Sequence, residues 1–297
     1  MPKPNRLPLP ADAPILAALG RYGYLTADQV RRLRYGPGVI TYVRGRLRRL
    51  VDAGLVARLE QPHFGPAGSA PGVFRLTGRG RRFARALGVN PVRLPDERPA
   101  SYLYYAHTLA LNDALVAAEL LVGSRPRLSL ERLVHERELK RAPVAVRLAS
   151  GAEVSVVPDA YLRLHEREPG GPGYLLDLIW ELDMGTTEQR AFRRKVAALV
   201  AYGLGPYREA LGADSITIVL LAPGGERRAA ELLGWVEDEL AELDRRDLGG
   251  WFCVRGADPA AVRPEELYLA PAWRQPFRAD RVALLALADA PLGEGPA

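Results

Sequence analysis

The chain has 297 residues, of which 48% are hydrophobic and 26% are charged, so it has the composition of a globular protein with about two domains. These values exclude a disordered or fibrous chain. Residues 1–98 contain 18 basic and 6 acidic residues, a net charge of +12, whereas residues 99–297 contain 23 and 29, a net charge of −6. The N-terminal third is therefore expected to bind a polyanion, and the remainder is not.

Several functional classes are excluded or disfavoured by simple features. Cys253 is the single cysteine, so the chain holds neither a disulfide framework nor a cysteine-based zinc site. The start, MPKPNRLPLP, lacks the apolar core of a secretory signal, and no uninterrupted apolar run of about 18 residues predicts a membrane span. No GxxxxGKS phosphate loop occurs, so no nucleotide cofactor is expected. We expect a cytoplasmic protein with no membrane partner.

Prolines and composition shifts divide the chain into five segments. We predict a flexible tail at 1–13, a winged helix-turn-helix DNA-binding domain at 14–87, a linker at 88–101, an α/β domain at 102–286 and a flexible tail at 287–297.

The N-terminal segment has the element order of a winged helix. A short helix over 14–21 is followed by Thr26, which is expected to cap a second helix, ADQVRRLR. GPG at 36–38 breaks the chain before a third helix over 39–53, which stops at Gly54. LVARLE (55–60) and VFRLT (73–77) predict two strands of a wing, joined by a loop rich in glycine and proline.

The third helix is the expected recognition helix. Its apolar residues, Val43, Leu47, Leu50 and Val51, fall on one stripe that would pack against the other helices. The opposite face is basic, which favours contacts with base edges and phosphates, although a solvated helix face is the alternative. The predicted DNA-binding residues are Thr41, Tyr42, Arg44, Arg46, Arg48 and Arg49 on this helix, with Arg58 and Arg75 on the wing strands.

The C-terminal segment predicts the order α-β-β-β-α-β with additions. A long helix over 102–122 precedes several strand-like runs, and the apolar run YLLDLIWEL (174–182) is long enough for a central strand. Elements with helix and strand character alternate after it. The other predicted elements are strands at 130–139, 144–148, 153–157, 160–165, 216–221 and 251–255, and helices at 187–204 and 224–245.

Three carboxylates stand at strand positions in this segment. Asp159 lies in a predicted hairpin, and Glu181 and Asp183 end the apolar strand. Residues two apart in a strand face the same side, so Glu181 and Asp183 are expected to share a cation with Asp159. Carboxylate oxygens favour Mg²⁺ or Mn²⁺, which would activate water against a phosphodiester. All three are predicted metal ligands.

This arrangement resembles the PD-(D/E)xK nuclease superfamily. Asp159 matches the aspartate of its motif and Glu181 the second acidic residue, but Asp183 occupies the lysine position. In that superfamily the following helix sometimes supplies the lysine, and Lys195 is the lysine available there. The resemblance implies a restriction-endonuclease-like core with Asp159, Glu181, Asp183 and Lys195 as catalytic residues.

The chain also resembles a narrower family, the bacterial replication-relaxation proteins of plasmids and other mobile elements. The matching strings are ILAALGRYGYLTADQVRRL, AHTLALND, VVPDAYLRL and LIWELDMGTTEQRAFRRKVAALVAY. The resemblance implies a protein that binds double-stranded DNA and acts in replication or DNA relaxation. Two alternatives remain: an active Mg²⁺-dependent endonuclease or nickase, and a transcriptional or copy-number repressor without catalysis. A homodimer is a further alternative, because winged-helix proteins often dimerise.

Overall fold

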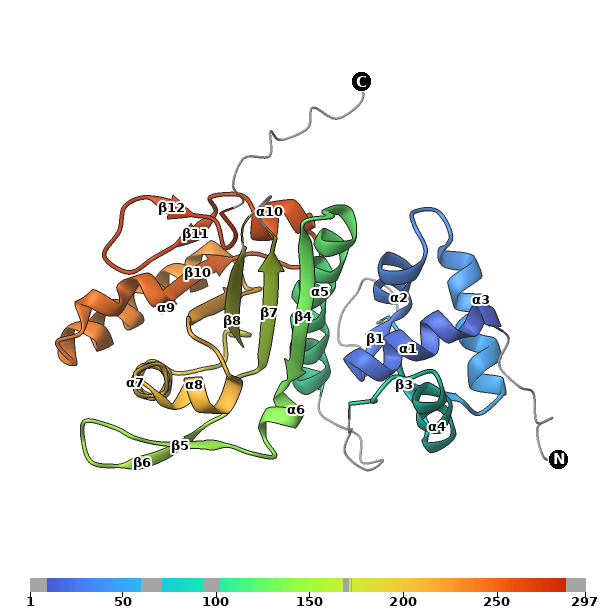
Figure 1. Ribbon diagram of the computed structural model, residues 1–297, viewed down its shortest axis with the longest axis horizontal. Helices are drawn as coiled ribbons and strands as arrows, with labels where there is room; N and C mark the ends of the chain where they lie inside the picture. The colour runs from blue at the N-terminus through green and yellow to red at the C-terminus, as the bar shows by residue number, and fades with distance from the viewer. Residues whose placement is uncertain (1–9, 60–70, 93–101, 168–170, 172, 287–297) are drawn as a thin grey trace, which may run out of the picture. The chain divides into compact units, whose positions relative to one another are not determined.

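The computed structural model describes residues 10–59, 71–92, 102–167, 171 and 173–286 (Figure 1). Its contacts divide the chain into two compact units, Met1–Val116 and Ala117–Ala297. Most of the two predicted tails, most of the predicted linker and the predicted wing loop lie outside the described residues. The part of the N-terminal tail that is described, Pro10–Asp12, forms a 3-10 helix instead.

The first unit is a winged helix. Thr26 caps α2 as predicted, and its hydroxyl accepts from the Gln29 backbone N–H at 3.1 Å while the Gln29 side chain accepts from the Thr26 N–H. The three strands pair antiparallel in the order β1-β3-β2. The elements are η1 (Pro10–Asp12), α1 (Ala13–Tyr22), β1 (Leu25–Thr26), α2 (Ala27–Arg34), α3 (Ile40–Asp52), β2 (Val56–Leu59), β3 (Val73–Leu76), α4 (Gly78–Ala86) and the first part of α5 (Tyr102–Ser124).

The division between the units falls inside α5, not at the predicted linker over 88–101. Asn112, in the middle of this apolar helix, is fully buried. Its side-chain amide donates to the backbone carbonyl of Tyr24 at 2.7 Å and to that of Tyr22 at 3.3 Å. The turn after α1 thus has its carbonyl groups satisfied by α5, so the first part of α5 is built into the winged helix.

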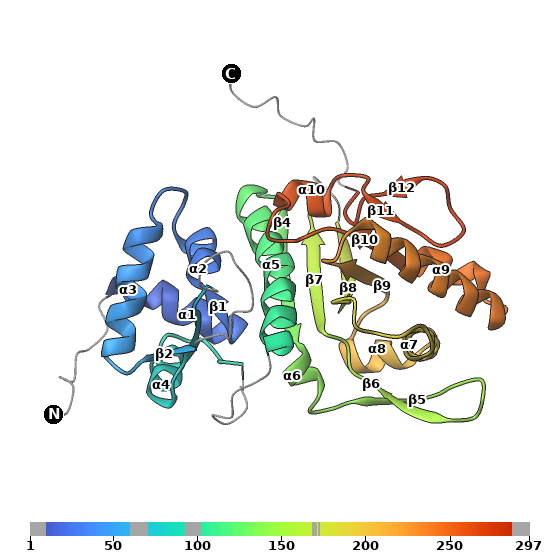
Figure 2. The ribbon, with the colours of Figure 1, turned by 180° about the vertical axis from the view of Figure 1, so that it is seen from behind.

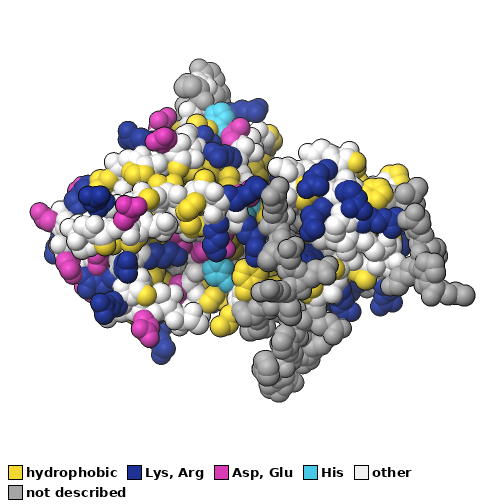
Figure 3. All heavy atoms as spheres, turned by 90° about the horizontal axis from the view of Figure 1, so that it is seen from below, with side chains coloured by type: hydrophobic (Ala, Val, Ile, Leu, Met, Phe, Trp, Pro, Cys, Tyr) yellow, Lys and Arg dark blue, Asp and Glu magenta, His cyan; other side chains and the backbone are white. Residues whose placement is uncertain are grey.

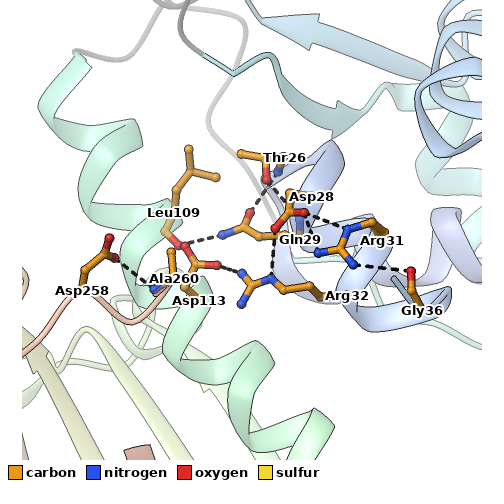
Figure 4. Close-up of polar contacts among 10 residues, drawn as sticks. All are labelled: Thr26, Asp28, Gln29, Arg31, Arg32, Gly36, Leu109, Asp113, Asp258 and Ala260. Atoms are coloured by element: carbon orange, nitrogen blue, oxygen red, sulfur yellow. Dashed lines mark hydrogen bonds and ion pairs between the residues drawn. The ribbon is translucent and has the colours of Figure 1, made fainter. Parts of the chain in front are cut away.

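A second set of contacts ties α5 to α2 (Figure 4). Gln29 donates its side-chain amide to the Leu109 carbonyl at 2.9 Å, while its oxygen caps the N–H of Thr26. Arg32, one turn after Gln29, forms an ion pair with Asp113. The winged-helix unit therefore extends about thirty residues beyond the predicted end at residue 87.

The amino-acid composition of α5 resembles that of a membrane-spanning helix. Residues Leu103–Ser124 form a helix that is long and apolar enough to cross a membrane by those two criteria. Yet 56% of the apolar window is buried in the protein, and Asn112 and Asp113 form polar contacts from its middle. These features are typical of an internal helix that packs on protein.

The second unit is built on a seven-stranded sheet with the order β12-β11-β10-β9-β8-β7-β4. β4, β7 and β8 pair antiparallel, and β8, β9 and β10 pair parallel. The predicted strand at 130–139 ends at His135, and α6 follows. The elements are β4 (Leu128–His135), α6 (Glu136–Leu139), β5 (Val144–Arg147), β6 (Glu153–Val156), β7 (Ala160–Glu166), β8 (Tyr174–Leu182), α7 (Gln189–Gly203), α8 (Pro206–Leu211), β9 (Thr217–Ala222), α9 (Glu226–Glu242), η2 (Arg246–Trp251), β10 (Phe252–Gly256), α10 (Pro264–Tyr268), β11 (Trp273–Arg274) and β12 (Arg281–Val282).

Strand alternation in β8 decides which side chains face which layer. Ile179 packs in the main core with residues of α7 and α9, whereas Trp180 contacts Tyr268 and Trp273 edge-on. Glu181 has the parity of Ile179 and therefore faces the α7 layer. β5 and β6 form a separate two-stranded hairpin, which lies beneath α7 and α8 in the two opposite views of Figures 1 and 2.

Cys253 lies buried in β10, and burial raises the pKa of its thiol from 9.0 to about 11. A raised thiol pKa lowers the thiolate fraction at pH 8 by about 100-fold, and the thiolate is the reactive form. We expect reaction with a thiol reagent at pH 8 to be at least about 100-fold slower in the native protein than in guanidinium. Equal rates, measured by absorbance, would show that the thiol is accessible.

Candidate DNA-binding surface and acidic site

The exposed face of α3 carries part of the predicted DNA-binding set. Val43, Leu47 and Leu50 are buried, as the apolar stripe predicted. Thr41, Tyr42, Arg44 and Arg48 are exposed, as predicted. Tyr42 is supported from the side by an edge-on ring contact with Tyr35 at 5.7 Å.

Arg46 and Arg49 are half-buried and paired, whereas the sequence predicted that both point outward. Both form ion pairs with Asp12, whose carboxylate is fully buried at the end of η1. Asp12 precedes α1 and lies in the segment predicted as a flexible tail, so its role could not be read from helix periodicity. Because their guanidinium groups already bind a carboxylate, Arg46 and Arg49 hold α3 in place and are poorly suited to bind phosphate.

Arg44 and Arg48 instead share a groove with Arg58 of β2. This groove has a volume of about 370 Å³ between α3 and the wing strands, and Ile40, Val51 and Phe74 contribute to its floor. Arg75 is half-buried on β3 and does not line the groove. The helix α4, which does not line this groove, is also basic and carries Arg79, Arg81, Arg82 and Arg85. Figure 3 shows Lys and Arg side chains gathered on the visible face of this unit.

In the second unit, Asp159 and Glu181 are brought together by strand pairing. Asp159 lies just before β7, and its backbone N–H donates to the Trp180 carbonyl at 3.1 Å. Its carboxylate accepts from the Leu182 backbone N–H at 2.8 Å. The two bonds bracket Glu181 on the neighbouring strand, and the Asp159 carboxyl group is near enough to raise the pKa of Glu181. The predicted pairing of these two residues is present.

Lys195 completes the group from α7. Its ammonium group forms an ion pair with the Glu181 carboxylate. The Glu181 side chain is 3% exposed and the Lys195 side chain 41% exposed, so the pair opens to solvent through the lysine. Both line a pocket of about 260 Å³ between α7 and the chain at 154–157. The helix after the apolar strand thus supplies a lysine next to the acidic pair, at the position the sequence suggested.

The electrostatics of the group follow from burial. Desolvation raises the pKa of Glu181 to about 8, Lys195 counteracts this, and the neighbouring Asp159 adds to the rise. Burial would lower the pKa of Lys195, but the charges of Glu181 and Asp159 outweigh it and raise that pKa. The group therefore holds a permanent cation against two carboxyl groups, one of which accepts a proton easily.

Asp183 does not join this group, in contrast to the prediction. Burial would raise the pKa of Asp183, but hydrogen bonds from Arg228 and from the Gly185 N–H outweigh it and lower the pKa. Arg228 Nε lies 2.8 Å from the Asp183 carboxylate and also stacks on Trp235 at 4.6 Å. Strand parity predicted Asp183 on the same side as Glu181. β8 ends at Leu182, and although the Asp183 backbone N–H still donates to the Leu221 carbonyl at 2.9 Å, its carboxylate turns to Arg228 of α9.

The donor set of the acidic site fits a hard divalent cation with part of its shell open. Mg²⁺ is commonly held by one or two carboxylates, with water and substrate phosphate completing its coordination. Asp159 and Glu181 are two such buried carboxylates, and Glu181 lines the pocket. Within the described ranges, no cluster of three or more His, Cys, Asp or Glu side chains could enclose a metal. The predicted three-carboxylate site is therefore reduced to a pair.

Sequence reasoning missed the residues that act through contacts across the fold, namely Asp12, Asn112 and Arg228. Asn112 and Asp113 could have been noticed as an adjacent polar pair in the middle of an apolar helix, LALNDALV. Asp12 and Arg228 have no comparable signal. Each is one charged residue among many, and its partner is more than thirty residues away.

Comparisons with known proteins identify a similar solved structure and a protein family. Bacillus subtilis PadR in complex with operator DNA is a similar solved structure at 14% identity, with a TM-score of 0.23 over 38% of this chain and 68% of PadR. No curated protein matches the chain. The family model for replication-relaxation matches residues 16–236, which is well over half of the chain. The chain therefore belongs to the replication-relaxation family.

Proposed function

We propose that the protein binds double-stranded DNA of a plasmid or other mobile element through its winged helix and hydrolyses a phosphodiester at Asp159, Glu181 and Lys195. The observation that carries the proposal is that Glu181 and Lys195 pair in a pocket of the second unit, with the Asp159 carboxyl group beside Glu181. This residue set is the one that the nuclease resemblance implies, with the lysine supplied by α7. Family membership supports the connection with replication or DNA relaxation.

In this proposal, water adds to phosphorus and one P–O ester bond breaks, which leaves a phosphomonoester end and a hydroxyl end. Asp159 and Glu181 would hold a Mg²⁺ or Mn²⁺ ion, which supplies Lewis-acid charge to the scissile phosphate. Lys195 stabilises the negative charge that develops on the phosphate oxygens as the water attacks. The buried position of Glu181 keeps the carboxylate pair close to the reacting phosphate and away from bulk water.

The test is incubation of the purified protein with supercoiled plasmid in Mg²⁺, in Mn²⁺ and in EDTA. We expect nicked or linear product with either metal and none in EDTA, read on an agarose gel. The Asp159→Asn variant should give no product while it still shifts linear duplex DNA. Intact plasmid in every lane with a persistent gel shift would reject the hydrolysis and leave a DNA-binding protein, as the repressor alternative requires.

For the winged helix, Arg44→Ala/Arg48→Ala should weaken duplex binding much more than Arg46→Ala/Arg49→Ala. The first pair is exposed, whereas the second is held by Asp12. Loss of two phosphate contacts should reduce the slope of log K against log salt by about 1.8. Fluorescence anisotropy with a labelled duplex measures this. A larger loss in the Arg46/Arg49 variant, with its fold intact by circular dichroism, would reverse the assignment.

A further inference from the structure

A groove runs along the side of α7 that faces the β5–β6 hairpin. Its inner part is the pocket of about 260 Å³ that contains Glu181 and Lys195. A second hollow of about 720 Å³ continues past the hairpin turn at 148–152 to the start of α7. Arg194 lines both hollows, so they adjoin at its side chain, and together they are here named the α7 groove.

The arginines near the start of α7 differ in their contacts. Arg193 donates from Nε to Glu239 at 2.9 Å and also pairs with Glu242, so it joins α7 to α9. Arg190 and Arg194 are exposed and line the groove. Neither guanidinium forms an ion pair or hydrogen bond with a described residue. They lie one helical turn apart on one stripe, which suits two successive contacts with an extended anion.

Figure 3 views the second unit from the hairpin side, where Lys and Arg side chains are interspersed with Asp and Glu side chains. The unit as a whole is therefore not a basic surface, and the two arginines are a local feature of the groove. The N-terminus of α7 borders the larger hollow, and its N-cap residue, Glu188, forms no side-chain capping bond. The N–H groups and dipole of a helix N-terminus favour an anion there, which adds to the arginines.

The depth of the acidic pair limits the form of the anion. Glu181 is 3% exposed, and its pocket of about 260 Å³ is small even for a ligand site. The phosphates of a paired duplex lie on the outside of a stiff rod, and they reach a recessed site only if the strand is deformed or unpaired. An unpaired strand bends freely and exposes its phosphates singly, so it can follow the groove inward.

We propose that the α7 groove binds one unpaired DNA strand, with Arg190 and Arg194 contacting its phosphates on the path to Glu181 and Lys195. This proposal rests on the proposed function, because it names the form of DNA that reaches the acidic site. It assigns different roles to the two units: the winged helix binds duplex DNA, and the second unit binds a strand released from it.

The test measures binding of a fluorescent 12-nucleotide oligo-dT to the full chain by anisotropy in EDTA, where no cleavage occurs. Arg44→Ala/Arg48→Ala serves as the background, to weaken the winged helix. Adding Arg190→Ala/Arg194→Ala should raise Kd about tenfold and reduce the salt slope by about 1.4, the value for two single-strand phosphate contacts. The matched control, Arg208→Ala/Arg227→Ala, removes two exposed arginines that line neither hollow and should change Kd less than twofold.

A cross-linking measurement locates the strand independently of affinity. Ala191 is exposed and lies on the groove stripe of α7, whereas Ala230 is exposed on α9 and lines neither hollow. Ala191→Cys should form a disulfide with an oligo-dT that carries an activated thiol tether, with release of the tether's leaving thiol. Ala230→Cys and the wild type, whose Cys253 is buried, should react at least fivefold less.

Equal losses of oligo-dT affinity in the groove and control variants, or equal cross-linking at Ala191 and Ala230, would overturn the proposal. Binding of a duplex 12-mer with the same dependence on Arg190 and Arg194 would overturn the single-strand assignment. The proposed hydrolysis can be rejected independently of the groove. If plasmid stays intact in metal but oligo-dT binding depends on these arginines, catalysis is rejected and the groove assignment is retained.

Discussion

Glu181→Gln should reduce metal-dependent plasmid cleavage about 10³-fold, and Lys195→Met should reduce it about 10²-fold or more. Glutamine keeps the shape of Glu181 but removes the charge that a divalent cation needs. Methionine keeps the length of Lys195 but removes the ammonium group that pairs with Glu181. Initial nicking rates in Mg²⁺ measure both effects, and anisotropy with a labelled duplex should show binding within about twofold of the wild type.

Asp183→Asn is the matched control for this series. It removes one carboxylate charge two residues after Glu181, from a side chain that binds Arg228 and not Lys195. We expect nicking rates within about threefold of the wild type at a temperature where the variant is folded, with a lower thermal midpoint because Arg228 loses one of its two carboxylate partners. If Asp183→Asn abolishes cleavage while Glu181→Gln spares it, the acidic site has been assigned to the wrong carboxylate.

Asp12→Asn should lower the free energy of unfolding of the winged-helix unit by about 3 kcal/mol. The carboxylate of Asp12 is fully buried against Arg46 and Arg49, and both guanidinium groups would lose their counter-charge. All four tryptophans lie in the second unit, so tryptophan fluorescence in a urea titration follows that unit and should be unchanged. Hydrogen exchange of the α3 amides follows the first unit and should become faster.

Asp28→Asn separates this effect from a general loss of negative charge. Asp28 is 57% exposed and pairs with Arg31 and Arg32 on the surface of α2. An exposed pair of this kind contributes about 0–1 kcal/mol, so hydrogen exchange in α3 should hardly change. Similar acceleration in the two variants would contradict the view that Asp12 holds α3 in place.

The local signals of the sequence were sufficient for the winged helix. Thr26 before an acidic first turn predicted the start of α2, and the spacing of Val43, Leu47 and Leu50 predicted the buried side of α3. Each signal depends on neighbours within about one or two turns, which the sequence displays directly. The order of strands and helices in the second unit was predicted for the same reason, whereas the nearness of Asp159 to Glu181 on paired strands was implied by the resemblance to nucleases.

The sequence could not predict the partner of a charged side chain. Arg46 and Arg48 lie on opposite flanks of the basic face of α3, and nothing within that helix shows that Arg46 binds Asp12 while Arg48 is exposed. Glu181 and Asp183 have the same strand parity, yet Lys195 binds one and Arg228 the other.

The sequence by itself determined that a basic winged helix precedes an α/β unit with acidic residues on adjacent strands. The tertiary structure decided which of these charged side chains form internal ion pairs and which side chains meet at the acidic site. It also decided that the first part of α5 is part of the winged-helix unit. The physical reason is range: capping and amphipathic spacing act within a few residues, whereas an ion pair forms wherever folding brings two charges within about 4 Å.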